Sequence, residues 1–251
     1  MYINDMDEYF ERYLGRIFYN IINDNFKNEI KTVVELGPGF RYKIACALQI
    51  INFNGTLYII DSNTEVLKYI KKKYKELLPY ATIKCINCDF VDSIKYLPKK
   101  IDLLLGNHII DDMIISKYLN NKLLKNAFNN TKLSSKLLNE SWKALSKSKL
   151  LNKYKKEVLN DFKTFYKNID VKLNILSGYK SGYYVDDKNY IEDLINDTFI
   201  ILKKHIKTDN KSVSKSLDFY MKDFDVCLKD NGLHLLDNIQ NSKNWIVGKY
   251  E

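Results

Sequence analysis

The feature that most constrains this fold is a glycine turn directly after a short apolar strand. Residues 33–36 read Val-Val-Glu-Leu, Gly37, Pro38 and Gly39 follow, and residues 41–51 continue with a helical pattern. Glycine lets the backbone approach a ligand where a side chain would collide, and a helix N-terminus offers unpaired N–H groups. A strand that meets a helix through such a turn is typical of nucleotide-binding α/β domains.

The same turn argues against a dinucleotide ligand. A dinucleotide fingerprint needs a third glycine for close packing of the helix on the strand, and Tyr42 occupies that position. Pro38 has no N–H group, so one donor for a pyrophosphate is missing. A ligand without phosphates loses less from this change. S-adenosylmethionine, which consists of adenosine, a sulfonium and an amino-acid tail, is such a ligand.

Three further apolar runs have the length and composition of strands. They occupy residues 56–60, 81–86 and 101–105. Between the first two, apolar residues recur at helical spacing. Strands that alternate with helices indicate a parallel sheet, so we expect an α/β fold with a Rossmann-like, mostly parallel sheet flanked by helices.

Each of these expected strands leads into residues that can bind a ligand. Asp61 lies about 20 residues beyond Gly39, where such units place the carboxylate that accepts from the ribose hydroxyls. The residues at the other two strand ends are Asp89 with Phe90 and Asn107 with His108. Asp89 can accept from an adenine amino group, and the Phe90 ring can lie against the base. Carboxyl ends of parallel strands form one rim, and ligands of open α/β sheets bind there.

Together these motifs resemble the class I S-adenosylmethionine-dependent methyltransferases. The matching segments are residues 35–39, Asp61, residues 88–90, the region of Asn107, and residues 227–237, which look like the turn into the family's fifth strand. The resemblance implies that Glu35, Gly37 and Gly39 hold the methionine part, Asp61 the ribose, and Asp89 with Phe90 the adenine, with Asn107 as a further cofactor contact. Arg41 departs from the family, which often has a third glycine there.

The resemblance also suggests a division of the chain. If residues 232–237 are the fifth strand, its connection from the fourth is far longer than a simple crossover helix requires. We therefore expect an N-terminal helix in residues 1–28 and a binding domain in residues 29–118 and 226–251. Residues 119–225 then form a large helical cap inserted between the fourth and fifth strands.

The segments outside the cofactor half are mostly helical in pattern. Apolar residues recur at helical spacing in residues 7–26, 151–166 and 191–206. Between the last two lies a segment rich in glycine and tyrosine, whose Tyr179 and Tyr183 either contact the substrate from a mobile lid or belong to a plain surface loop. Residues 244–250 can add one more strand.

Composition limits the partners. The net charge is +9, yet only Arg12, Arg16 and Arg41 are arginines among 40 basic residues, and the lysines are spread along the chain. Nucleic-acid contacts more often use clustered arginine, so a nucleic-acid partner is not expected. Four cysteines and three scattered histidines give no metal-ligand spacing, and no metal is expected. Without a membrane span or signal pattern, we expect a cytoplasmic protein; the pattern does not indicate an oligomeric state.

The residues after the fourth strand are the candidates for catalysis. Methyl transfer mainly requires alignment of the acceptor, and a base where the acceptor carries a proton. His108 is the candidate base, and Asn107 can orient the acceptor. Asp111 and Asp112 either hold a cationic acceptor, such as an amine or guanidine, or stabilise a helix N-terminus. His108 also has a purely structural alternative.

The expected function is therefore methyl transfer from S-adenosylmethionine to a small molecule or short peptide. Three alternatives stay open: transfer of the aminocarboxypropyl group from the same cofactor, methylation of RNA, and a non-catalytic subunit that only binds the cofactor.

Overall fold

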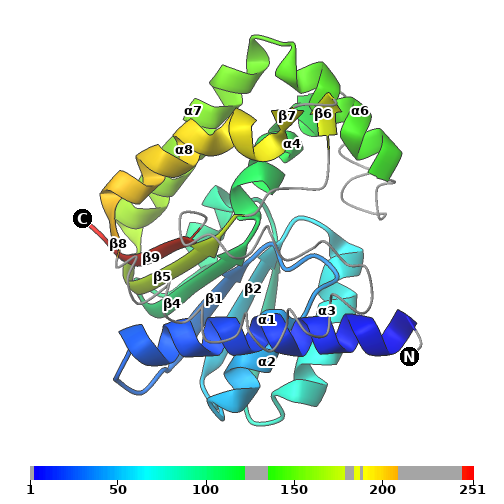
Figure 1. The fold of residues 1–251 in the computed structure, drawn as a ribbon. Coiled ribbons are helices and arrows are strands. Elements are labelled where there is room, and N and C mark those ends of the chain that lie inside the picture. Colours follow the sequence, from blue (N-terminus) through cyan, green and yellow to red (C-terminus); the bar gives the residue numbers. More distant parts are fainter. Residues whose placement is uncertain (1–2, 122–134, 179–183, 187–188, 209–244) are drawn as a thin grey trace.

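The computed structural model describes residues 3–121, 135–178, 184–186, 189–208 and 245–251 of the 251-residue chain (Figure 1). The helices are α1 (Ile3–Asn25), α2 (Lys43–Ile50), α3 (Thr64–Leu77), the 3₁₀ helix η1 (Val91–Tyr96), α4 (Ile109–Asn121), α6 (Ser135–Ser146), α7 (Leu150–Asn168) and α8 (Ile191–His205). The strands are β1 (Thr32–Leu36), β2 (Thr56–Asp61), β3 (Thr82–Asn87), β4 (Lys100–Asn107), β5 (Asp170–Ser177), β6 (Tyr184–Asp186), β7 (Asn189–Tyr190), β8 (Ile206–Thr208) and β9 (Trp245–Tyr250).

The main sheet has the strand order β3-β2-β1-β4-β5-β9-β8, and β6 pairs with β7 in a separate hairpin. Strands β1 to β5 are parallel, whereas β9 runs antiparallel to both β5 and β8. The first five strands follow the order of a Rossmann sheet, in which the order along the sheet switches between β1 and β4 while the strands stay parallel. The expected α/β, Rossmann-like class is confirmed, and the strand expected over residues 244–250 is β9.

Helices cover both faces of this sheet. Side chains such as Val33, Leu57 and Leu105 pack against α1, α2 and α3 on one face. Their neighbours along the strands, including Val34 and Leu104, pack on the opposite face against α4, α7 and α8. Because successive residues of a strand point to opposite faces, β1 and β4 are apolar almost without interruption.

The expected N-terminal helix is α1, which lies beside α2 in Figure 1. Its apolar stripe is buried, and Phe18 contacts Trp245 of β9 edge to face with the ring centroids 5.1 Å apart. A Cβ atom at Gly15 would meet the Cβ atom of Cys46 at 2.6 Å and the carbonyl oxygen of Lys43 at 2.9 Å. Only glycine therefore lets the two helices approach this closely.

The fifth strand is not where the sequence analysis expects it. β5 is the parallel neighbour of β4 along nearly its whole length, and it occupies part of the range 119–225 assigned to an inserted cap. Helix α7, which precedes β5, packs its apolar face against the sheet. Most of the described part of the expected cap, namely α7, β5, α8 and β8, therefore belongs to the sheet domain. Residues 227–237 and the loop with Tyr179 and Tyr183 lie outside the described residues.

The helical patterns of residues 151–166 and 191–206 are confirmed as α7 and α8. Figure 1 shows α6 and the β6–β7 hairpin together at the end of the molecule opposite α1 and α2. None of the helices in the described part of the chain is long and apolar enough to span a membrane.

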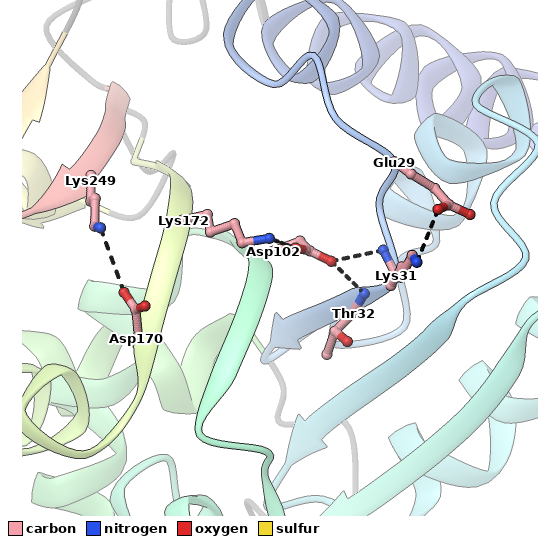
Figure 2. A network of polar contacts seen from close by, with 7 residues as sticks. All are labelled: Glu29, Lys31, Thr32, Asp102, Asp170, Lys172 and Lys249. Atoms are coloured by element: carbon pink, nitrogen blue, oxygen red, sulfur yellow. Dashed lines mark hydrogen bonds and ion pairs between the residues drawn. The ribbon is translucent and has the colours of Figure 1, made fainter.

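At the amino ends of the strands, Asp102 of β4 joins three strands (Figure 2). Its Oδ2 accepts from the backbone N–H groups of Lys31 and Thr32 at 2.8 and 2.9 Å. Its Oδ1 accepts from the Lys172 ammonium of β5 at 2.7 Å. Asp170 and Lys249, also drawn in Figure 2, form a longer ion pair of 3.7 Å between exposed side chains.

Candidate cofactor site at the carboxyl ends of β1, β2 and β4

The glycine turn after β1 depends on two left-handed residues. Gly37 and Gly39 have φ angles of +53° and +58°, a region that other residues rarely adopt. The Gly37 N–H group donates to the Ile60 carbonyl of β2 at 2.8 Å, and a Cβ atom at Gly37 would meet Ile109 Cδ1 at 2.7 Å. At Gly39 an added Cβ atom would have no neighbour within 4 Å. The turn is thus fixed at Gly37 by the hydrogen bond to β2 and the contact with α4, whereas Gly39 has free space beside it.

Asp61, at the end of β2, stands beside this turn. Its Oδ1 accepts from the Asn63 N–H group at 2.8 Å, and the Gly39 N–H group also donates to the carboxylate. Burial raises the pKa of Asp61 to about 6, against the opposing effect of these two donors. A carboxylate has about four acceptor positions, so two backbone donors leave room for hydroxyl groups of a ligand.

Glu35, expected to contact the methionine part, is almost fully buried. It is 3% exposed, and its Oε2 accepts from the Tyr74 hydroxyl of α3 at 2.6 Å. Burial raises the pKa of Glu35 to about 8, although the Tyr74 hydrogen bond and the Lys43 charge act in the opposite direction. The Glu35 side chain thus links the end of β1, just before the turn, to α3. Direct contact with a ligand stays a prediction for Glu35.

Arg41 does not disturb the turn. The glycines at 37 and 39 supply its positive φ angles, so position 41 does not require a third glycine. The Arg41 N–H group donates to the Pro38 carbonyl at 3.3 Å, and its guanidinium pairs with the buried Glu11 of α1 at 3.3 Å. The departure from the family pattern therefore changes how α1 meets the turn, while the glycine conformations stay.

Asn107 is the last residue of β4 and His108 follows it, and hydrogen bonds to Ser177 of β5 fix both residues. The Ser177 hydroxyl donates to Asn107 Oδ1 at 2.9 Å, and the His108 N–H group donates to the Ser177 carbonyl at 2.7 Å. His108 has a φ angle of +63°, which is unusual for a residue with a side chain. Strained residues of this kind gather at functional sites.

The electrostatic setting of His108 keeps its imidazole neutral. Burial lowers the pKa of His108 well below its ordinary value, and the positive charge of Lys43 lowers it further. Asp111 and Asp112 lie in the first turn of α4. Burial and the repulsion between the two carboxylates raise the pKa of Asp111. Asp112 is exposed, and its pKa is raised by desolvation from the surrounding protein atoms and by the charge of Asp61.

The turn after β3 differs from the expected adenine site. Phe90 is 8% exposed and lies against α7, with its ring centroid 4.9 Å from that of Phe162 and 4.7 Å from that of Phe165. So little accessible surface is left on Phe90 that stacking on an adenine does not fit this conformation. Asp89 is exposed in the same turn, and its expected contact with adenine stays a prediction.

The structure therefore brings together most of the residues singled out in the sequence. Glu35, the glycine turn, Asp61 and the Asn107–Asp112 segment meet around the carboxyl ends of β1, β2 and β4. Sequence reasoning missed several polar residues that support them: Glu11, Lys43, Tyr74 and Ser177. Among the described residues, no group of three or more His, Cys, Asp and Glu side chains is placed to hold a metal ion.

Comparisons with known proteins concern the fold. No protein-family model matches this chain, and no curated protein does. Solved structures that match include StiE O-MT, with 12% sequence identity and a TM-score of 0.41; the match covers 94% of this chain and 73% of that one. The bifunctional kinase-methyltransferase WbdD has 12% identity and a TM-score of 0.41, and the match covers 77% of this chain and 34% of that one. The plantazolicin methyltransferase BpumL in complex with SAH has 13% identity and a TM-score of 0.39, and the match covers 84% of this chain and 64% of that one.

The chain spans about a third of the length of the WbdD chains that it matches. With identities and TM-scores this low, activity and substrate have to be argued from the site of this chain itself.

Proposed function

We propose that this chain is a methyltransferase that uses S-adenosylmethionine and acts on a small molecule or a short peptide. The observation that carries the proposal is the glycine turn at the switch point of the sheet. It presents the open left-handed Gly39 beside the Asp61 carboxylate. Open α/β sheets bind their ligands at this point. A turn without a third glycine and with a proline between its glycines favours a nucleoside without phosphates.

The residues of the site match the parts of such a cofactor. Asp61, held in place by two backbone donors, supplies acceptors for the ribose hydroxyls. Gly37 and Gly39 allow the methionine part to approach the backbone, and the buried Glu35 joins the end of β1 to Tyr74 of α3 just before the turn. When bound, S-adenosylmethionine supplies a methyl group activated by the adjacent sulfonium.

The chain's own task is then to position an acceptor and to handle its proton. Ser177 fixes Asn107 and His108 at the end of β4, so that both can orient an acceptor near the rim. A neutral His108 imidazole has a lone pair with which to take a proton from an acceptor. Asp111 and Asp112 add carboxylates that can pair with a cationic acceptor such as an amine or guanidine. A neutral acceptor remains compatible with this site when these carboxyls are protonated.

The proposal is tested by methyl transfer to a panel of amines, guanidines and short peptides, with cofactor that carries a labelled methyl group. The expected result is labelled acceptor together with S-adenosylhomocysteine, and loss of both in Asp61→Ala. Methylthioadenosine as the product would instead mean aminocarboxypropyl transfer. Tight cofactor binding without turnover of any acceptor would favour a non-catalytic binding subunit.

A further inference from the structure

Helix α2, which starts just after the glycine turn, has no capping hydrogen bond from its own N-cap side chain. Tyr42 is its N-cap residue, the Tyr42 side chain makes no capping hydrogen bond, and the first turn of the helix contains no acidic residue. The first N–H groups of a helix have no partner within the helix and need an acceptor from elsewhere. The acceptor at this helix determines how firmly the segment next to Gly39 is held.

Glu11 of α1 supplies that acceptor from a different helix. Its Oε2 accepts from the Tyr42 N–H group at 2.7 Å, and its Oε1 accepts from the Arg41 guanidinium at 3.3 Å. Glu11 is fully buried, whereas Glu8, one turn earlier on α1, is exposed and pairs with Arg12 of its own helix. A buried carboxylate that accepts from a backbone N–H group makes a strong, geometrically defined hydrogen bond.

The charge of Glu11 has a second task at the same junction. Lys43, the first residue of α2, is 7% exposed and lies at the positive end of the helix dipole. Three carboxylates have charges that favour the Lys43 ammonium there, and Glu11 has the largest effect, ahead of Glu35 and Asp112. Without Glu11, this buried cation depends on Glu35 and Asp112, and desolvation raises the pKa of both these carboxyls and so disfavours their ionisation. The start of α2 therefore depends on Glu11 for both an acceptor and a counter-charge.

We infer that Glu11 is a positioning residue for the cofactor. By holding the N-terminus of α2, it fixes the Gly37–Gly39 turn, so the affinity for the cofactor depends on the docking of α1. This inference rests on the proposed function, and it extends the site to α1, the helix that packs beside α2. The close approach of α1 and α2 at Gly15 keeps Glu11 within reach of Tyr42.

The test compares Glu11→Ala and Glu11→Gln with the matched control Glu8→Ala on the same helix. Two quantities are measured: the Kd for S-adenosylhomocysteine by calorimetry, and hydrogen exchange of the Tyr42 amide in the ligand-free protein. Hydrogen bonds to charged groups are strong enough that we expect Glu11→Ala to weaken binding roughly tenfold and to speed exchange at Tyr42. Glu11→Gln keeps an acceptor for the Tyr42 N–H group but loses the charge, so it should recover part of the affinity and protection, and Glu8→Ala should change neither.

The inference is overturned if Glu11→Ala binds as the native chain does with Tyr42 still protected, or if Glu11→Gln loses as much as Glu11→Ala. If the alanine variant fails to fold, the glutamine variant is compared with the native chain, and equal affinity together with equal protection of Tyr42 would overturn the inference. Failure of the proposed function is recognised separately, because then the native chain itself binds no S-adenosylhomocysteine. In that case exchange at Tyr42 still shows whether Glu11 holds the N-terminus of α2.

Discussion

The contacts of Asp102 predict a large loss of stability from a substitution that changes almost no volume. In Asp102→Asn one oxygen remains for the two backbone donors, while the new NH₂ group faces the Lys172 ammonium. Hydrogen bonds to a charged group contribute about 1.5–3 kcal/mol and neutral ones about 0.5–1.5 kcal/mol, so each of the two backbone bonds weakens by about 1 kcal/mol. The ion pair with the half-exposed Lys172 adds about 0–1 kcal/mol. The free energy of unfolding should fall by about 2–3 kcal/mol.

Urea denaturation at neutral pH measures this change, and Asp170→Asn is its matched control. Asp170 pairs with Lys249 at the same end of the sheet (Figure 2), but both side chains are exposed, so its loss should be within about 0.5 kcal/mol. Equal losses from the two substitutions would show that the burial of Asp102 and its two backbone hydrogen bonds do not contribute to the free energy of unfolding.

The same carboxylate predicts the pH dependence of this difference. Burial alone would raise the pKa of Asp102, but the Lys172 ammonium and the two N–H groups outweigh it and hold the pKa below its ordinary value. A carboxyl with a lowered folded-state pKa stabilises the protein above the unfolded-state pKa, and this stabilisation is lost as the pH falls through the folded-state pKa. The difference in free energy of unfolding between the native protein and Asp102→Asn should therefore be constant from pH 7 to about pH 5 and decrease below about pH 4.

Three further predictions concern the cofactor site. Because the pKa of Glu35 is raised to about 8 in the folded protein, burying this side chain destabilises the protein increasingly as the pH rises from the ordinary glutamate pKa toward 8. Glu35→Gln should therefore unfold at a higher urea concentration than the native chain at pH 8. This difference should disappear near pH 4, where Glu35 is protonated in both the folded and the unfolded state. Gly37→Ala should cost more stability than Gly39→Ala, by about 1 kcal/mol in urea denaturation, because only position 37 adds a collision with Ile109 to the left-handed strain; equal losses would contradict this. His108→Ala should lower kcat and leave the Kd for S-adenosylhomocysteine nearly unchanged, and unchanged turnover would exclude His108 as the base.

Much of the fold could be predicted because each strand of the β1–β4 half is followed by a recognisable helix or turn. The strand β1, its glycines and the helix after it follow one another without interruption, and β2 ends in Asp61 in the same way. Buried parallel strands are short apolar runs, and the helices between them show their apolar face at regular spacing. The amphipathic helices α1, α7 and α8 were predictable for the same reason.

The strand β5 was missed for a local reason. Its sequence, Asp-Val-Lys-Leu-Asn-Ile-Leu-Ser, alternates apolar and polar residues only as far as Ile175 and directly follows the long apolar pattern of α7. The later segment around residues 227–237 resembles a family motif, and that likeness displaced the fifth strand in the interpretation. An alternating run beginning at Val171 was the signal that pointed to β5.

The supporting residues of the site were missed because their partners are distant in sequence. Glu11 interrupts the apolar stripe of α1, and a buried acid on such a stripe requires a partner, but the sequence does not say that Tyr42 and Arg41 supply it. Tyr74 has the spacing of a core residue, and its hydroxyl contact with Glu35 depends on how α3 packs. Phe90 was assigned a role that it does not have. Its place beside Asp89 indicated a contact with adenine, but in the structure its ring packs on α7.

Calorimetric titration of the native chain with S-adenosylmethionine, S-adenosylhomocysteine and NAD shows directly whether the glycine turn and Asp61 form a site for S-adenosylmethionine. We expect both sulfur ligands to bind in the micromolar range, NAD not to bind, and Asp61→Ala to remove most of the affinity. Binding of NAD, or no binding of either sulfur ligand by the folded native chain, would show that this site does not bind S-adenosylmethionine.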